Sequence, residues 1–528
     1  MAGPAAGLAG LVAAGAVALA TREEDHPRTM IKVSDFPTLQ DAVNALESGG
    51  ELLIPPGSHP LASPVRFREL KNIRVVGHGA TLVATKRIVA LFAFTACSNV
   101  RMEGLAFDQG ANRIAAYAAS DYPTLYNVAV HCSGGCDGVS IDGCSFSRLY
   151  TVAIYFKDSS SLRVTGCDFA SPLQPQGHHL EFILLQTFAG DCGISRNGFS
   201  GAATTRPDRS PAAVAMSGGT GRIAIENNRA QWCGRNNGDA HRLGVFDVYA
   251  DCRNVTIRGN QAYDCLEQFA RLSTCVDVQV IANTVTISRF ASMAPAYSAI
   301  TVESGSFPAV PNAVCQRIRI EGNTIVDAAN RQAFMIGVLA YDWGAAPVDV
   351  RIARNLLTGS QRAFYVSGPF DSLEISGNTV RDVEQLIEST RGEGLTAALG
   401  AQSNARFARL VVDDNDATIR PGVTMVPVSV SIDSVPPFTG SVGSVHFQRN
   451  RIKAQAPATT IAVNIIVNAR KTQGEFVARN NVIEGYSTPF LIRSVARATL
   501  VDNQAPGHTT LLNRGSSRYG VLEALRNR

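Results

Sequence analysis

The sequence predicts an all-β solenoid, in which short strands stack coil upon coil along one axis. Two observations predict this fold class. A short motif returns at intervals of 22 to 40 residues, for example as RIRIEGNTIVD at Arg317–Asp327 and as LEISGNTVRD at Leu373–Asp382. Apolar and polar residues alternate with a period of two around each copy, which is typical of strands. The spacing between copies has a fixed minimum, and some copies lie further apart by a variable number of residues. This indicates coils that carry loop insertions.

The motif has one recurrent polar residue, at its sixth position. We expect it to lie at a tight bend between two strands, where an Asn amide can bond the equivalent amide of the next coil. Asn also tolerates the left-handed backbone conformation of such bends. The sixth position holds His78, Leu105, Cys144, Cys167, Asn197, Asn228, Asn260, Asn283, Asn323, Asn355, Asn378, Asn415, Asn450, Asn481 and Asn503.

Turns of the GNTI type at this spacing resemble those of the right-handed parallel β-helix of the pectin-lyase-like superfamily. The resemblance covers about Ile73 to Asn503 and implies a single-stranded β-helix of about fifteen coils, stacked roughly 4.8 Å apart. Bacteriophage tailspike and depolymerase proteins are the members that the chain resembles most. Because the superfamily also contains lyases, hydrolases and epimerases, the resemblance implies a fold rather than one activity.

A helix is predicted before the first coil. The stretch FPTLQDAVNALESGGELLIPPGSH, Phe36–His59, places Leu39, Val43 and Leu46 on one helical face and continues into a strand. Such a helix would close the end of the solenoid and shield its strand edges. We therefore expect four parts: an apolar attachment segment 1–30, a helix-strand cap 31–72, the β-helix 73–505 and a C-terminal tail 506–528.

The N-terminal segment leaves two alternatives open. Met1–Thr21 contains no Lys or Arg, so it lacks the basic start of a signal peptide, although Ala18–Ala20 resembles a cleavage site. An ordered helix or packing segment is the other alternative. The stretch is mostly Ala and Gly, so we expect no membrane span.

Composition excludes several partners. The net charge is only +4 and no dense Lys/Arg cluster occurs, so no nucleic-acid partner is expected. The eleven cysteines have no zinc-site spacing, and neither a metal nor another cofactor is expected.

Five cysteines lie three residues before a motif copy, which predicts a row of small buried thiols, with disulfides between coils as the alternative. These five are Cys97, Cys136, Cys252, Cys275 and Cys315.

Candidate catalytic residues follow from the superfamily's geometry, in which one strand of each coil lines the substrate groove. In GVFDVYA the alternation directs Asp247 outward, and in SAITVES it directs Glu303 outward. Glu267 lies between them along the chain, in a stretch that alternates poorly. Paired carboxylates are what glycosidic cleavage requires, and nearby like charges raise one pKa. We take these three as candidate acid/base residues, with a solvated surface as the alternative.

Candidate substrate-binding residues flank these acids. Aromatic rings stack on sugars and Arg binds acidic sugars, although each residue has an ordinary packing role as its alternative. The residues are Tyr249, Arg271, His241, Tyr341 and Trp343. A second cluster, QGHHLEF, contains His178, His179 and Glu181. A His–Glu pair there is a candidate base with its orienting acid, and a polar loop is the alternative. The fragments Gly77–Gly79 and Arg451–Lys453 do not form the polygalacturonase pattern, because no paired Asp precedes the first.

The sequence favours a tailspike-like virion protein that binds and depolymerises a bacterial surface polysaccharide. Reduced buried thiols suit assembly in a reducing cytoplasm. The resemblance implies a homotrimer, joined to other virion tail proteins through the N-terminal segment. The alternatives are an exported bacterial polysaccharide lyase, hydrolase or epimerase, which would be extracellular, and a glycan-binding adhesin without catalysis.

Overall fold

The structure is a computed structural model. It describes residues 29–115, 118, 124–171, 181–201, 210–234, 244–265, 268–288, 298–305, 314–329, 332–340, 346–390, 406–432, 441–454, 459–467, 474–493, 495–507, 512–513 and 521–527.

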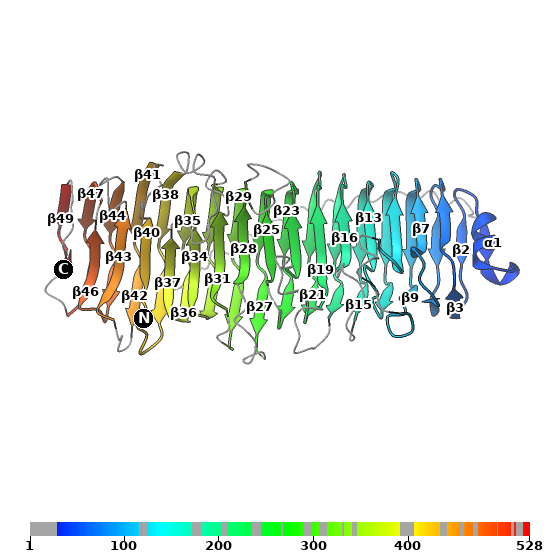
Figure 1. Cartoon of the computed structure of the whole chain (residues 1–528), viewed down its shortest axis with the longest axis horizontal. Coiled ribbons are helices and arrows are strands. Elements are labelled where there is room, and N and C mark those ends of the chain that lie inside the picture. The colour runs from blue at the N-terminus through cyan, green and yellow to red at the C-terminus, as the bar shows by residue number, and fades with distance from the viewer. Residues whose placement is uncertain are drawn as a thin grey trace, which may run out of the picture.

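Three long parallel sheets run the length of the molecule, and each coil adds one strand to each sheet (Figure 1). Sheet A consists of β1 (Met30–Lys32), β2 (Glu51–Leu53), β5 (Arg74–Val76), β8 (Ser98–Glu103), β11 (Asp137–Asp142), β14 (Ser160–Thr165), β17 (Cys192–Ser195), β20 (Ile223–Glu226), β23 (Arg253–Arg258), β26 (Val276–Ile281), β29 (Gln316–Glu321), β32 (Val348–Ala353), β35 (Phe370–Ser376), β38 (Arg406–Asp413), β41 (Ser441–Gln448), β44 (Glu475–Arg479), β47 (Arg497–Val501) and β49 (Val521–Leu525).

Sheet B follows sheet A in each coil, across the bend that carries the recurrent Asn. It consists of β3 (Gly57–Leu61), β6 (Ala80–Ala84), β9 (Ala106–Asp108), β12 (Ser145–Ser147), β15 (Asp168–Ala170), β18 (Gly198–Ser200), β21 (Arg229–Gln231), β24 (Gln261–Tyr263), β27 (Thr284–Ile287), β30 (Thr324–Asp327), β33 (Leu356–Gly359), β36 (Thr379–Val383), β39 (Asp416–Ile419), β42 (Arg451–Ala454) and β45 (Val482–Glu484).

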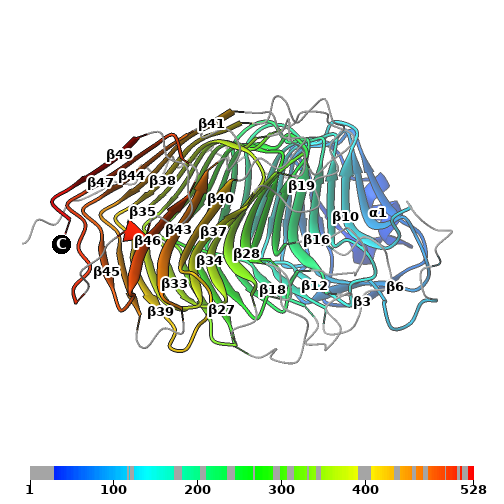
Figure 2. The same ribbon diagram turned by 60° about the vertical axis from the view of Figure 1, so that its left-hand side comes forward.

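Sheet C completes each coil. Figure 2 shows several of its strands side by side, among them β16, β19, β28 and β37. It consists of β4 (Val65–Arg68), β7 (Ala90–Thr95), β10 (Val128–Ser133), β13 (Ile154–Lys157), β16 (Glu181–Gln186), β19 (Ala212–Ser217), β22 (Phe246–Tyr249), β25 (Ala270–Ser273), β28 (Ser298–Ser304), β31 (Phe334–Ala340), β34 (Arg362–Ser367), β37 (Gln385–Thr390), β40 (Val428–Ile432), β43 (Ile461–Val467), β46 (Thr488–Arg493) and β48 (Leu512–Asn513).

Matching side chains of successive coils stack on one another inside the solenoid. Phe107, Phe146, Phe169 and Phe199 occupy equivalent positions on β9, β12, β15 and β18. Their ring centroids are 5.1, 4.6 and 4.8 Å apart along the row. A short strand cannot bury its apolar residues alone, so this stacking supplies the core of each coil.

The predicted Asn row is confirmed. The Nδ2 of Asn260 donates to Oδ1 of Asn283 at 3.0 Å, and the backbone N–H of Asn260 donates to the same oxygen at 2.9 Å. The pattern runs from Asn197 to Asn503 and then to Asn527, which follows β49. Since β49 pairs with β47, the strand stack continues into the segment that the sequence predicted to be a tail.

The expectation about the backbone of this Asn is corrected. The left-handed residue is the one before it: Gly259 has φ +65°, Ala282 has φ +54° and Gly322 has φ +63°. The ladder Asn residues are absent from the described residues with positive φ. Where the preceding residue is Gly, as at Gly259 and Gly322, it adopts this conformation without strain.

The first helix lies at the N-terminal end of the solenoid (Figure 1). After the short 3₁₀ turn η1 (Val33–Asp35), the helix α1 (Leu39–Asn44) begins at Thr38, whose hydroxyl accepts the Asp41 N–H at 3.1 Å. Leu39, Ala42 and Val43 are buried in the core. In the described part of the chain, no helix is long and apolar enough to cross a membrane.

The predicted buried thiols are confirmed. All eleven cysteines are free and buried. In the row that the sequence singled out, the Sγ atoms of Cys275 and Cys315 lie 3.9 Å apart in neighbouring coils. Cysteine therefore serves here as a small apolar residue of the interior.

Candidate functional site

Four predicted site residues lie together on the outer face of sheet C. Phe246 and Val248 of β22 are in the core, so the residues that alternate with them, Asp247 and Tyr249, point outward. Asp247 pairs in register with Arg271 of β25, and the next outward residue of β25 pairs with Glu303 of β28. Three successive coils therefore supply the two carboxylates and the guanidinium.

Arg271 and Glu303 form a nearly buried ion pair. The Nε of Arg271 lies 2.9 Å from Oε2 of Glu303, and the two side chains are only 13% and 5% exposed. A charge pair with so little water around it is costly to leave incomplete, because either partner alone would be an uncompensated buried charge. Glu303 is thus held in place by the strand before it.

Asp247 forms no such ion pair with the residues that the structure describes. It is fully buried, and neither carboxyl oxygen has a hydrogen-bond partner among the described residues. Burial raises the pKa of this carboxyl to about 7, with Arg271 opposing the rise and Glu303 adding to it. The sequence left open a solvated surface acid, and the structure instead buries it. A group with this pKa exchanges a proton readily at neutral pH.

Other buried polar groups lie on the same coil as Asp247 or on nearby coils. Burial raises the pKa of the Tyr249 phenol, with smaller contributions from the charges of Glu181 and Asp247. Glu181 itself is buried at the start of β16. Gln268, three residues before Arg271, is fully buried, and neither its Oε1 nor its Nε2 has a partner in the described part of the chain.

Sequence reasoning missed Gln268, and it named Glu181 only in a second cluster. Gln268 stands beside Glu267 in EQFARLS, which could have drawn attention to it. It was missed because the search was for acids, and a carboxamide does not transfer a proton at neutral pH. Glu267, His241, Tyr341 and Trp343 lie outside the described residues, as do His178 and His179. Their predicted roles stay predictions.

The arrangement offers acid/base chemistry. Asp247 and Glu303 lie on strands two spacings apart and are two residues out of register, so their backbones are separated by roughly 12 Å. Inverting glycosidases place two carboxyls about 6.5–9.5 Å apart, and retaining ones about 5 Å apart. The two backbones lie farther apart than either spacing, so the reach of the two side chains sets the distance between their carboxyl groups. In the described residues, no group of three or more His, Cys, Asp or Glu side chains is arranged to hold a metal ion.

Comparison with known families agrees with this architecture. The family described as "Right handed beta helix region" matches residues 128–380, which include the candidate site. The chain is a right-handed parallel β-helix. No curated protein matches this β-helix.

Several solved structures resemble the β-helix at low identity. ORF18 of Geobacillus virus E2 is 15% identical, with a TM-score of 0.33, over 49% of this chain and 57% of that one. The catalytic unit of a thermostable GH87 α-1,3-glucanase from Streptomyces thermodiastaticus is 13% identical, with a TM-score of 0.34, over 95% and 69%. The surface adhesin PfbA of Streptococcus pneumoniae is 12% identical, with a TM-score of 0.35, over 93% of each chain. Similarity of this degree carries no information on activity.

Proposed function

We propose that this β-helix binds a bacterial surface polysaccharide on the outer face of sheet C and cleaves it by acid/base catalysis. Asp247 is the group that transfers the proton, and Glu303, which the ion pair with Arg271 holds in place, is the second carboxylate of the pair. Tyr249 packs at the edge of the same site.

One observation supports this function above the others: the fully buried Asp247 carboxyl has no hydrogen-bond partner among the described residues. A buried polar group without a partner costs roughly 1–3 kcal/mol, and more when charged. Folds tolerate such a cost mainly at functional sites, where a ligand supplies the missing bonds. Gln268 is a second such group, because neither its Oε1 nor its Nε2 has a hydrogen-bond partner among the described residues. A carboxamide can bind sugar hydroxyls.

The test replaces Asp247 with Asn, which keeps the shape and removes the proton transfer. We expect kcat on a cleaved polysaccharide to fall by roughly 100-fold or more, while binding is retained. Capsular polysaccharides and O-antigens would be screened, with new reducing ends revealing hydrolysis and unsaturated products revealing a lyase.

Glu388→Gln is the matched control. Glu388 occupies the same outward row on β37 and is ion-paired with Arg362 at 2.5 Å. Its replacement should leave cleavage unchanged. Full cleavage by Asp247→Asn would refute the proposal. Binding by the wild type without any cleavage would favour the adhesin alternative.

A narrower proposal concerns location and assembly. We propose that the chain is a tail protein of a virion, assembled as a homotrimer and joined to other tail proteins through residues 1–30. Eleven unpaired buried thiols support it, because they suit folding in a reducing cytoplasm. Light scattering on the purified protein measures the oligomer, and a monomer mass would contradict the trimer. Secretion remains the alternative location.

A further inference from the structure

At the N-terminal end of sheet C, the outward strand residues include cations but no acids; the acids Glu69 and Asp158 lie just after β4 and β13. The outward residues of β4 are Arg66 and Arg68, and Arg66 pairs in register with Ala93 of β7. The same outward rows continue through β10 and reach Lys157 on β13. Between these cations the outward residues are Ala93, Thr95, His131, Ser133 and Tyr155, none of them acidic.

Two ion-paired arginines of sheet A, Arg74 and Arg319, provide a contrast. There Arg74 lies 2.9 Å from Glu51 and 2.6 Å from Glu103, and Arg319 lies 2.9 Å from Asp349. By contrast, neither Arg66, Arg68 nor Lys157 forms an ion pair with any residue that the structure describes. Cations that form no ion pair attract anions from solution, and guanidinium groups bind carboxylates and phosphates through two hydrogen bonds.

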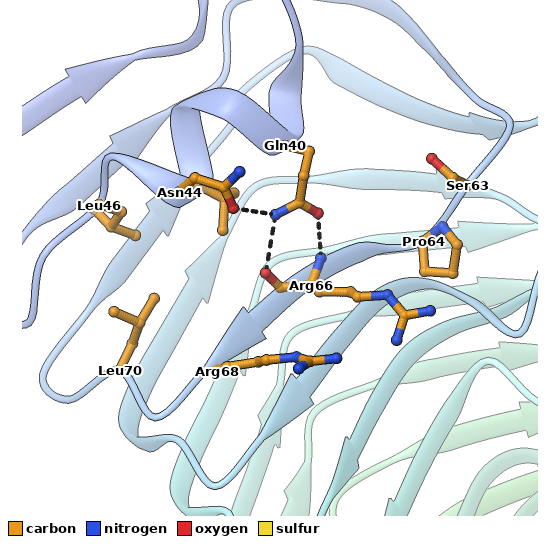
Figure 3. Close-up of a pocket in the computed structure, with 9 residues that line it drawn as sticks. Gln40, Asn44, Leu46, Ser63, Pro64, Arg66, Arg68 and Leu70 are labelled. Carbon is orange, nitrogen blue, oxygen red and sulfur yellow. Dashed lines mark hydrogen bonds between the residues drawn. The ribbon is translucent and has the colours of Figure 1, made fainter.

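The two arginines line a cleft between α1 and β4. Its volume is about 600 Å³, and Gln40, Asn44, Ser63 and Pro64 also contribute to its wall. Figure 3 shows both arginine side chains extending in the same direction. The Gln40 carboxamide accepts the Arg66 N–H at 2.8 Å and donates to the Arg66 carbonyl at 3.2 Å. The backbone that presents Arg66 is therefore fixed at the sheet edge.

A stacked pair of rings lies beside Lys157, with His131 on β10 and Tyr155 on β13. The His131 and Tyr155 rings are 5.0 Å apart and inclined by only 15°. The Tyr155 hydroxyl donates to Oε1 of Gln186 at 2.6 Å, which fixes the phenol. Burial and the nearby charge of Lys157 lower the pKa of His131, so its imidazole is neutral at pH 7. Neutral rings with polar edges suit the sugar rings between charged groups.

We propose that Arg66, Arg68 and Lys157 form an anion-binding extension of the sheet C face, which takes the carboxylate or phosphate groups of an acidic glycan. The extension spans three strand spacings, roughly 14 Å, and Asp247 lies three further spacings along the same face. The glycan therefore lies along the solenoid axis, with its charged groups bound several sugars away from the reacting bond. This inference rests on the proposed function and names its substrate class.

The test compares the affinity of three polymers for the Asp247→Asn protein, which binds without cleaving. Polygalacturonate supplies carboxylates, poly(glycerol phosphate) supplies phosphates, and dextran is neutral. We expect at least one acidic polymer to bind more tightly than dextran, with an affinity that falls as salt rises. Adding Arg66→Ala, Arg68→Ala and Lys157→Ala should weaken its binding about tenfold and reduce the salt dependence. Whichever acidic polymer is preferred identifies the anionic group.

The matched control removes three exposed arginines from sheet A, Arg163, Arg253 and Arg497, which likewise form no ion pair with a described residue. It should leave the affinity unchanged. Equal affinity of the sheet C triple variant and its parent would overturn the inference, as would an equal loss in the control. So would binding of neither acidic polymer above dextran. Failure of the proposed function is distinguishable, because it would appear as cleavage that persists without Asp247.

Discussion

The buried carboxyl of Asp247 lowers the stability of the fold when it is ionised. Its strand neighbours place it outward, where a carboxylate is normally solvated, yet it is fully buried. Burial disfavours the charged form, and the Arg271 guanidinium offsets this only in part because it is paired with Glu303. The native state therefore retains the Asp247 proton at pH values where an exposed aspartate is ionised.

This retention makes stability depend on pH with a definite sign. The unfolded chain releases the proton near a pKa of about 3.9, whereas the native state releases it at about 7. Between these values the native state binds more protons, so its free energy of unfolding falls as pH rises. We expect Asp247→Asn to be more stable than the wild type by on the order of 1–4 kcal/mol at pH 8, and nearly equal at pH 4.

Denaturant midpoints at the two pH values measure this difference. Glu388→Gln, at an ion-paired and partly exposed carboxylate of the same outward row, should show no such gain at pH 8. A variant that gains stability while losing cleavage would mark Asp247 as functional. Loss of stability at both pH values would instead indicate that the carboxyl supports the fold.

At the scale of the element, the bend between sheets A and B is built from two residues with different tasks. The Asn amide links successive coils, since Asn283 donates to Asn323 at 2.9 Å. The residue before it takes the left-handed conformation, which costs a residue with a Cβ about 1–2 kcal/mol. Ala282 bears this strain at φ +54°, whereas Gly322 adopts φ +63° freely.

Exchanging these two residue types should change stability in opposite directions. Ala282→Gly should raise the free energy of unfolding by about 1 kcal/mol, and Gly322→Ala should lower it by a similar amount. A Cβ added at Gly322 would have no atom within 4 Å, so backbone strain alone acts there. Thermal unfolding followed by circular dichroism measures both shifts.

Gly359 supplies the comparison for that experiment. A Cβ added there would lie 2.2 Å from the carbonyl oxygen of Asp327, which is backbone and cannot move aside cheaply. Gly359→Ala should therefore be clearly more destabilising than Gly322→Ala. Equal effects of the two substitutions would contradict the account of backbone strain.

At the scale of the whole molecule, stability is distributed along the solenoid because each coil contacts mainly its two neighbours. Neighbouring coils share every sheet, the Asn ladder and the stacked core rows. The buried thiols report on this continuity, since they lie in coils from Cys97 to Cys315. A break in the stack between those positions would expose some of them.

Thiol labelling tests the whole-molecule arrangement. We expect none of the eleven cysteines to react with a thiol reagent in the native protein, and all eleven to react in denaturant without a reductant. Mass spectrometry of the labelled protein counts them. Fewer than eleven labels in denaturant would indicate disulfides, and labelling of the native protein would place a thiol at the surface.

Much of this architecture was predictable, because its signal is periodic. The motif spacing predicts stacked coils, the recurrent Asn predicts the ladder, and alternation around Asp247 and Glu303 places both on one outer face. These are local patterns repeated coil by coil, so a residue's direction follows from its immediate neighbours. The left-handed position was misassigned by one residue, since both Gly and Asn favour such bends and the sequence does not separate their roles.

By itself, the amino-acid order determined a solenoid of parallel strands, its buried thiol row and the common face of Asp247, Tyr249, Arg271 and Glu303. Only the tertiary structure decided that Arg271 pairs with Glu303 and that Arg66 and Arg68 line a cleft beside α1. It also decided that Asp247 is buried without a hydrogen-bond partner among the described residues. The physical reason is that burial and pairing depend on groups brought together from distant coils. Periodicity reports the direction of a side chain but not what surrounds it.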